Sequence, residues 1–185
     1  MELLHIGHCI FGDEYAIVAA NCSVEVLAFG NSEPTAIYGH VKLNGDVIWQ
    51  SAWRNASFPR GRGVNVMLVN PFSCSLQQPV SNYDTYSCGA AATQLSDYLQ
   101  QVDHGSIIVA VSADEPTANL ANALSTMSEM GAHVCDVQWR GAFGFVAQKD
   151  FPEKTVLRKV TTHQVAAWMQ PHFRVVVTGS RKVCV

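Results

Sequence analysis

The sequence predicts an α+β domain in which helices pack against a β-sheet. Two observations carry the prediction. The first half holds apolar, β-branched runs separated by glycine and asparagine turns, and the second half alternates apolar runs with two stretches of helical spacing. No period of repeated segments and no low-complexity stretch interrupts this order. Extended segments followed by strand–helix–strand–helix–strand are typical of the α+β class.

The first half is expected to be extended throughout. Asn44-Gly45 lies between two apolar runs, which is the strongest short-range signal for a β-hairpin. A loop rich in glycine and proline then leads into a nearly all-apolar run, which we interpret as a buried central strand. The predicted strands are Tyr15–Ala20, Ser23–Ala28, Ala36–Leu43, Val47–Trp49 and Val64–Val69.

The second half is expected to contain two main helices. The first covers Ala90–Gln101 with Ser87 as its N-cap, and the second begins at Pro116 and ends at Gly131. Apolar residues of the second helix fall on one face, which would cover the sheet. The remaining elements are predicted as strands at Ile107–Val111, Phe143–Ala147 and Arg174–Thr178, with a short helical piece at His163–Met169.

Length and charge fit one domain spanning residues 1–185. Hydrophobic residues make up 48% of the chain and charged residues only 15%, against about 25% in a typical globular protein. The net charge of −3 comes without any block of like charges, so no binding of nucleic acid is expected. The apolar runs are too short to cross a bilayer, so no membrane insertion is expected either.

Six cysteines, widely spaced and without a C-x-x-C pair, indicate disulfides and an oxidising compartment. The alternative is a set of buried free thiols in a cytosolic protein. Two N-x-S sequons, at Asn21 and Asn55, favour the extracellular interpretation. Residues Met1–Ile10 lack the pattern of a signal peptide, so we expect a secreted chain from which the signal has been removed. The cysteines are Cys9, Cys22, Cys74, Cys88, Cys135 and Cys184.

Five short segments, in order, resemble the interleukin-like EMT inducer (ILEI, or GG) domain family over roughly Cys22 to Lys149. That family includes small secreted signalling proteins, modules of extracellular hyaluronan-processing proteins, and the stem domain of a glycosyltransferase. The segments are Arg60–Val66, Tyr83–Tyr86, Asp103–Glu115, Met130–Ala132 and Gln138–Val146.

The resemblance implies a β-sandwich-like core of two sheets with two or three helices packed against it, and no catalytic machinery. The ILEI-like core would span 22–149, with an N-terminal extension over 1–21. A C-terminal extension over 150–185 is expected to fold back on the N-terminal strands. A disulfide from Cys184 to Cys9 or Cys22 would hold it there.

The resemblance also implies a sugar site. In the glycosyltransferase stem, the sugar contacts come from an Arg-Gly, an Asp-Glu and a Trp-Arg motif, which map here onto Arg62, Asp114 and Arg140. Trp139 and Glu115 lie beside them in the chain and join the predicted site. This chain departs from the family pattern at Gly141, where an aspartate is usual, and at Phe143-Gly144, where a tryptophan is usual.

These residue types suit a sugar, because arginine donates through a rigid fork, aspartate accepts from neighbouring hydroxyls, and an aromatic face covers the C–H side of the ring. The structural alternative is that Asp114 caps the helix opened by Pro116 while Arg140 pairs with Asp114 and holds two loops together. No cofactor is required. A calcium ion held by Asp84 and Asp114 is one further way to bind hydroxyls.

We therefore expect a secreted lectin for a terminal sugar such as galactose or N-acetylglucosamine. Its partners would be glycans, and it would be a homo-oligomer, because a single-site lectin needs several copies to cross-link. Cys74 is one candidate for stapling a homodimer. The alternative is a cytokine-like signalling protein with a protein receptor. Cys88 precedes a helix, as an activated thiol would, but no enzyme signature surrounds it, so we expect no catalysis.

Overall fold

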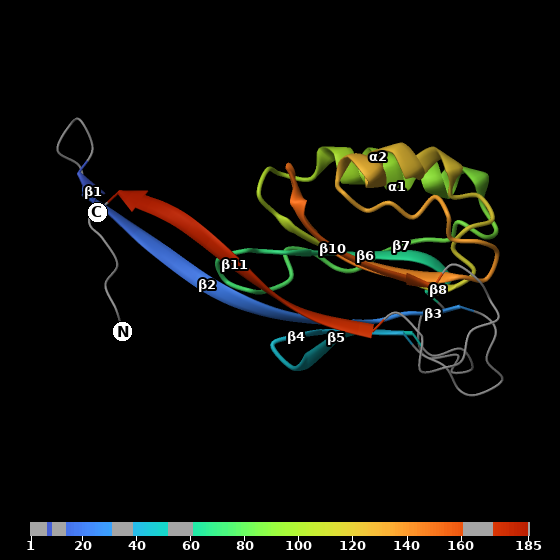
Figure 1. Ribbon diagram of the computed structural model, residues 1–185, viewed down its shortest axis with the longest axis horizontal. Helices are drawn as coiled ribbons and strands as arrows, with labels where there is room; N and C mark the ends of the chain where they lie inside the picture. Colours follow the sequence, from blue (N-terminus) through green and yellow to red (C-terminus); the bar gives the residue numbers. More distant parts are fainter. Residues whose placement is uncertain (1–6, 9–13, 31–38, 52–60, 161–171, 185) are drawn as a thin grey trace.

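Two β-sheets and a pair of helices form three stacked layers in the computed structural model (Figure 1). The structure describes residues 7–8, 14–30, 39–51, 61–160 and 172–184. Sheet B lies in the middle, with the helices on one face and sheet A on the other (Figure 1). The α+β class and the two-sheet core with packed helices are thereby confirmed.

Sheet A is built around one long strand, β2 (Glu14–Leu27), where the sequence predicted two. Strand β11 (His172–Cys184) pairs with β2 antiparallel along its whole length, from His172 opposite Leu27 to Cys184 opposite Tyr15. The two strands extend together away from the rest of the molecule (Figure 1). The segment His172–Cys184 therefore folds back on the N-terminal strand, whereas Phe151–Val160, also part of the predicted extension, pairs with another strand in sheet B.

The other strands of sheet A are short. β4 (His40–Leu43) and β5 (Asp46–Gln50) form a hairpin beside the inner end of β2, and β1 (Gly7–His8) pairs with its outer end. Asn44 and Gly45 both have positive φ, 53° and 95°, as a type I′ turn requires. The hairpin predicted from Asn44-Gly45 is confirmed.

Sheet B has the order β10-β9-β8-β6-β7. Its central strands β6 (Gly63–Val69) and β8 (Ile107–Asp114) are buried along nearly their whole length, as their apolar runs predicted. β9 (Ala142–Gln148) and β7 (Ser81–Tyr83) flank them. After β2 the chain passes from sheet A to sheet B, where the short strand β3 (Phe29–Gly30) pairs parallel with the end of β8. The edge strand β10 (Phe151–Val160) was not predicted.

The first helix begins one residue earlier than the sequence predicted, and the second begins five residues later. α1 (Gly89–Gln101) has Cys88 as its N-cap, because the Ser87 hydroxyl donates to Asp84 instead. The second helix does not begin at Pro116 but at Ala121, as the turn η1 (Ala121–Ala123) followed by α2 (Leu124–Glu129). Thr85 accounts for the delay, since its hydroxyl donates to the Pro116 carbonyl and its own carbonyl accepts from the Asn119 amide. The predicted helix His163–Met169 lies outside the described residues.

Two apolar cores result, one on each face of sheet B. One lies between the sheets and contains Val24, Val41 and Met67, and the other lies between sheet B and the helices and contains Leu95, Met127 and Phe145. The strands β6, β8 and β9 of sheet B are therefore mainly apolar on both faces, and most polar residues of these segments come before or after the strands. None of the described helices is long and apolar enough to span a membrane.

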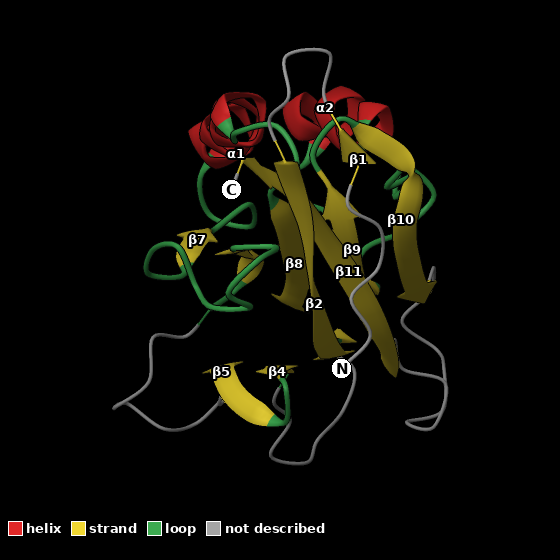
Figure 2. Cartoon of the chain, turned by 90° about the vertical axis from the view of Figure 1, so that its left-hand side faces the viewer, coloured by secondary structure: helices red, strands yellow, loops and turns green. Residues whose placement is uncertain are grey.

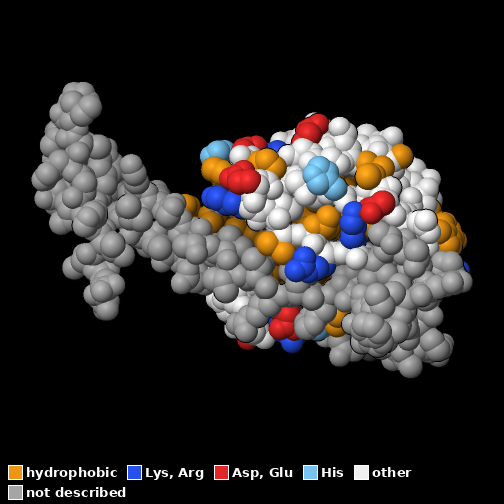
Figure 3. Space-filling view, in the orientation of Figure 1, with side chains coloured by type: hydrophobic (Ala, Val, Ile, Leu, Met, Phe, Trp, Pro, Cys, Tyr) orange, Lys and Arg blue, Asp and Glu red, His pale blue; other side chains and the backbone are white. Residues whose placement is uncertain are grey.

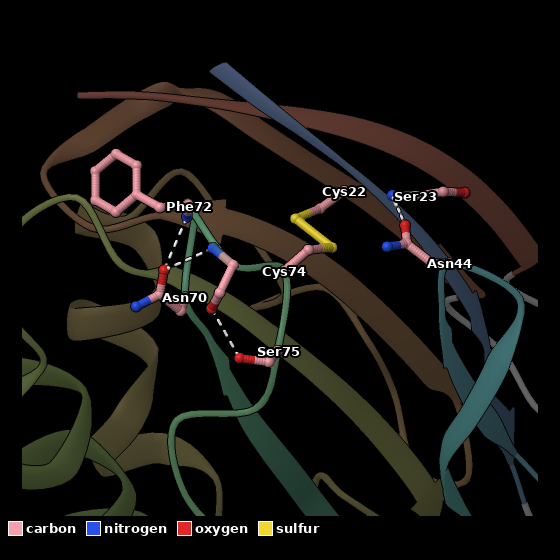
Figure 4. Close-up of a disulfide and its surroundings, with 8 residues drawn as sticks. Cys22, Ser23, Asn44, Asn70, Phe72, Cys74 and Ser75 are labelled. Atoms are coloured by element: carbon pink, nitrogen blue, oxygen red, sulfur yellow. Dashed lines mark hydrogen bonds between the residues drawn. A yellow bond between two sulfur atoms is a disulfide. The ribbon is translucent and has the colours of Figure 1, made fainter. Parts of the chain in front are cut away.

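A disulfide joins Cys22 on β2 to Cys74, with a Cα–Cα distance of 5.4 Å (Figure 4). Asn70 shapes the turn that carries Cys74, because its side-chain oxygen accepts from the amides of Phe72 and Ser73. The pairing corrects two expectations: Cys22 is not the partner of Cys184, and Cys74 is not available to staple a dimer. Cys9 lies outside the described residues.

Replacing both partners, Cys22→Ala with Cys74→Ala, is expected to lower the free energy of unfolding by about 2–4 kcal/mol, because a closed loop restricts the unfolded chain. Urea denaturation measures the change, and Cys135→Ala, which removes an exposed free thiol, serves as the control. Peptide mapping without reduction checks the pairing itself. Alkylation of Cys22 and Cys74 in unreduced native protein would contradict it.

Candidate functional site

Polar residues gather where three neighbouring strands of sheet B begin or end. Arg62 directly precedes β6, Asp114 ends β8, and Arg140 comes shortly before β9. The strands are antiparallel neighbours, with Gly63 opposite Ala113 and Val111 opposite Gly144. The start of β6, the end of β8 and the start of β9 therefore meet at one end of sheet B. We call the group of polar residues there the strand-end site.

Arg62 is fixed by a bidentate ion pair. Its Nε and Nη2 atoms donate to the two carboxylate oxygens of Asp84 at 3.0 and 2.7 Å. The guanidinium also lies over the ring of Tyr86, 4.5 Å from its centroid. Burial alone would raise the pKa of Asp84, but hydrogen bonds from Arg62 and Ser87 outweigh it and lower the pKa to about 2.

Gly63 allows this pair to form. Its φ is +92°, and a Cβ atom there would lie 2.1 Å from the carbonyl oxygen of Tyr83 and 2.7 Å from the amide nitrogen of Thr85. Only glycine lets the backbone after β7 approach the start of β6 this closely. Because Gly63 has no side chain, the segment that carries Asp84 can lie close enough for Arg62 to pair with it.

Asp114 is the least satisfied group of the site. Its Oδ1 atom is buried and has no hydrogen-bond partner among the described residues. Burial raises the pKa of Asp114, and the guanidinium groups of Arg62 and Arg140, which favour its charged form, do not cancel this effect. A buried acceptor without a donor is rare in native proteins and calls for an explanation.

Glu115 holds the loop that carries Arg140. It is only 2% exposed. Its Oε1 atom accepts from the backbone nitrogen and the hydroxyl of Thr117 at 2.7 and 2.6 Å, and Oε2 accepts from the backbone nitrogen of Arg140. Both carboxylate oxygens are thus occupied by protein donors, so Glu115 acts from beneath the site.

The backbone is strained on both sides of this carboxylate. Asp114 has φ = 62° and Arg140 has φ = 60°, the left-handed region that residues with a Cβ atom rarely adopt. Each such residue costs about 1–3 kcal/mol and persists only when its surroundings enforce it. Here the hydrogen bonds of Glu115 hold Arg140 next to the end of β8.

An aromatic pair forms the exposed wall of the site. Trp139 is 48% exposed and Tyr86 is 40% exposed. Their ring centroids are 5.7 Å apart with an interplanar angle of 52°. Tyr86 belonged to a segment of the family resemblance but was not predicted as a site residue. Its proximity to Arg62 and Trp139 arises from the loop between β7 and α1, which no local pattern reveals.

The structure brings all five predicted sugar-site residues to the same end of sheet B, where β6 and β9 begin and β8 ends. The capping alternative for Asp114 is wrong, because the helix starts at Ala121 and Asp114 ends a strand. Arg140 and Asp114 form no ion pair within 4.0 Å. As for calcium, the described residues contain no group of three His, Cys, Asp or Glu side chains that could hold a metal ion, and Asp84 is committed to Arg62 and Ser87.

Charge elsewhere on the visible face is dispersed. Acidic and basic side chains alternate across the described part of the surface in Figure 3, without a patch of one sign. The described part of that face therefore shows no extended electrostatic footprint for a charged partner.

A comparison with known protein families finds a match over the part of the chain that builds the strand-end site. Residues 62–151 match the sequence model of the family described as interleukin-like EMT inducer. The match begins at Arg62 and ends at Phe151, so it includes sheet B from β6 to β9, both helices and every residue of the site. A search of curated proteins found no significant match. Over residues 62–151 the chain is thus similar to the interleukin-like EMT inducer family.

Truncation of the buried carboxylate, Glu115→Ala, is expected to destabilise the protein by about 2–4 kcal/mol, because it leaves the backbone nitrogens of Thr117 and Arg140 without an acceptor. Chemical denaturation measures the loss, and the amide NMR signals of Trp139 and Arg140 should broaden or shift. Glu153→Ala, an exposed glutamate on β10, is the matched control and should change stability by less than about 0.5 kcal/mol. Unchanged signals in Glu115→Ala would refute the positioning role.

The low pKa of Asp84 predicts an acid-dependent term in stability. The folded-state pKa is about 2 and the ordinary value is 3.8, so the stabilising contribution is complete above about pH 4 and is lost as the pH falls towards 2. In Asp84→Asn this term is absent, so the gap in unfolding free energy between wild type and variant should narrow over that pH range. Asp97→Asn, an exposed aspartate on α1, is the control. A gap that stays constant down to pH 2 would rule the coupling out.

Proposed function

We propose that this domain is a secreted, non-catalytic carbohydrate-binding protein whose sugar site is the strand-end site. The observation that supports the proposal most directly is the buried Oδ1 atom of Asp114, which has no donor among the described residues. A ligand hydroxyl would supply that donor, after a small movement of the Asp114 side chain towards the surface. An unmet acceptor held in a strained backbone is the mark of a site prepared for something other than the protein itself.

The neighbouring groups complete a recognition set for a sugar ring. Arg140 is exposed, and no described residue accepts a hydrogen bond from its guanidinium, so that the whole donor fork remains for a ligand. Arg62 uses Nε and Nη2 on Asp84 and keeps its other N–H groups. Trp139 and Tyr86 offer apolar faces on which the C–H side of a sugar ring stacks.

The charge of the site favours a neutral sugar. Three carboxylates, those of Asp84, Asp114 and Glu115, face the guanidinium groups of Arg62 and Arg140, which leaves one negative charge in excess. A ligand carboxylate or sulfate would be repelled by that excess. The proposal therefore keeps to a neutral terminal hexose such as galactose or N-acetylglucosamine, and excludes sialic and uronic acids as preferred ligands.

The extracellular location is part of the proposal. It is supported by the Cys22–Cys74 disulfide, since such bonds persist in oxidising compartments and are rare in the cytosol. Glycans would be the partners, and assembly into a homo-oligomer would let several copies cross-link them. Calcium has no supporting ligand cluster among the described residues, so we propose binding without it.

A cytokine-like signalling protein is the second candidate. The description of the matched family, interleukin-like EMT inducer, is the observation that favours it. A receptor would contact a broad, well-packed surface, whereas a sugar needs only the small set of groups at the strand ends. The two candidates therefore differ in what single substitutions at the site should do.

Binding to an array of neutral and acidic glycans, with and without EDTA, tests the proposal. We expect retention of one class of neutral terminal sugars in both conditions. Arg140→Ala, Trp139→Ala and Asp114→Asn should each weaken it by about tenfold or more, as loss of one charged hydrogen bond or one stacking face predicts. Arg158→Ala, an exposed arginine on β10, is the matched control.

The outcomes separate the candidates. Absence of binding to every glycan, or an affinity that none of Asp114→Asn, Arg140→Ala and Trp139→Ala lowers, would exclude a sugar site at the strand ends. Binding lost in EDTA would contradict the metal-free mechanism. Receptor-dependent signalling by cells that is insensitive to Arg140→Ala and Trp139→Ala would favour the cytokine-like candidate.

A further inference from the structure

A second hollow lies at the other end of α1. It has a volume of about 380 Å³ and opens between the last turn of α1 and the segment that precedes β7. The rim carries Gln77 and Gln78 on one side and Gln101 and Asp103 on the other. We call it the glutamine groove. Its volume falls within the range of roughly 300–1,000 Å³ that is usual for small-molecule sites.

The walls of the glutamine groove are fixed by the fold. The backbone nitrogen of Gln77 donates to the Leu68 carbonyl on β6 at 2.9 Å, and the side-chain amide of Gln78 donates to the hydroxyl of Tyr98. On the helix side, the Lys149 ammonium donates to the carbonyls of Leu99 and Gln100 at 2.9 and 3.3 Å. These bonds hold the end of α1 in place, so the groove exists before any ligand arrives.

The chemistry of the lining is distinct from that of the strand-end site. Three side-chain amides and a hydroxyl surround a small apolar floor made by Leu68 and Val102. Among the described residues, no lysine, arginine or histidine lines the groove. Each amide offers both donors and an acceptor in one plane, which matches the paired hydroxyls of a sugar. The carboxylate of Asp103, with no cation lining the groove, disfavours anionic ligands.

An extended peptide fits this place less well. A peptide that added a strand to the edge of sheet B would need free backbone groups on the edge segment. The backbone nitrogen of Gln77 is already used on Leu68, and Pro79 has no N–H to give. The exposed polar groups of the groove are side-chain amides instead, and they stand above an apolar floor.

We propose that the glutamine groove is a second carbohydrate site, which binds a neutral sugar through Gln78, Gln101 and Asp103 above the floor formed by Leu68 and Val102. The site lies at the C-terminal end of α1 and the strand-end site lies just before its N-terminus. A helix of 13 residues separates them by about 20 Å. The groove is a separate site and does not depend on the proposed function of the strand-end site.

Two sites on one rigid domain make a single copy of the chain bivalent. Two sugars about 20 Å apart on one branched glycan, or on two glycans, would then be bridged without any contact between protein copies. Bivalency within the monomer would supply the multivalent binding for which a single-site lectin needs an oligomer.

NMR titration of the full chain with two neutral disaccharides, lactose and N,N′-diacetylchitobiose, tests the groove. We expect one of them to shift the side-chain amide signals of Gln78 and Gln101. The double variant Gln78→Ala/Gln101→Ala, read from the backbone amide signals of Val102 and Asp103 in the groove, should bind that disaccharide about tenfold or more weakly, as the loss of two hydrogen-bonding side chains predicts. Gln94→Ala, an exposed glutamine on α1 away from the groove, is the matched control and should leave the response unchanged.

One further variant distinguishes the groove from the strand-end site. Asp114→Asn should abolish any response of the Trp139 indole signal while the response at Gln78 and Gln101 persists, so failure at the strand ends leaves the groove proposal standing. A groove response that survives Gln78→Ala/Gln101→Ala in a folded protein would overturn the proposal. So would the absence of any shift at Gln78 and Gln101 with both disaccharides, or a groove that responds only to a cationic peptide.

Discussion

Sheet B lies between sheet A and the helices, so its central strands lose contact with water on both faces. In Figure 2, where the helices lie above the strands, the same layering is seen from the side. Polar side chains inside these strands must then be satisfied internally. Asn65 donates to the Gly61 carbonyl, and Ser112 accepts from the Phe143 amide. Other polar chemistry is displaced to the ends of the strands, where Arg62, Asp114 and Arg140 meet.

This double burial also explains which elements could be predicted from the sequence. A strand buried on both faces must be a run of consecutive apolar residues, and β6 and β8 are such runs. The edge strand β10 carries a proline and four charged residues among its ten, so its sequence does not distinguish it from a loop. Pro116 favours a helix start by local geometry, but the tertiary hydrogen bonds of Thr85 hold the next residues in a turn. The helix-starting preference of Pro116 is thus overridden by the hydrogen bonds of Thr85, a tertiary contact that the local sequence does not reveal.

The residues of the strand-end site also fall into two groups, those that could be predicted from the sequence and those that could not. Arg62, Asp114 and Arg140 were predicted because motif resemblance preserves residue types, and the antiparallel order of β6, β8 and β9 then brings them together. The role of Glu115 could not be predicted, since it depends on a hydrogen bond to a backbone nitrogen 25 residues away. The disulfide partner of Cys22 was equally hidden, because spacing alone does not choose among the pairings of six cysteines.

The two proposed sites differ in what they cost the fold. The strand-end site combines two residues in the left-handed region, a buried glutamate and an aspartate oxygen without a donor. The left-handed residues and the unmet acceptor oppose folding, whereas the hydrogen bonds of Glu115 and the two apolar cores favour it. The glutamine groove does not oppose folding in this way, because its side-chain amides are exposed to water and the hydrogen bond that anchors Gln77 to Leu68 has normal length.

Strain of this kind persists where the surroundings enforce it, and at the strand ends it fixes the orientation of Asp114 and Arg140 before any ligand binds. The strand-end site, held by Glu115, should therefore discriminate sharply between sugars that differ in one hydroxyl. The glutamine groove has to order the exposed side chain of Gln101 when a ligand binds, which costs conformational entropy. It should bind more weakly and accept more sugars. One domain would then combine a selective site with a permissive one at a fixed distance along α1.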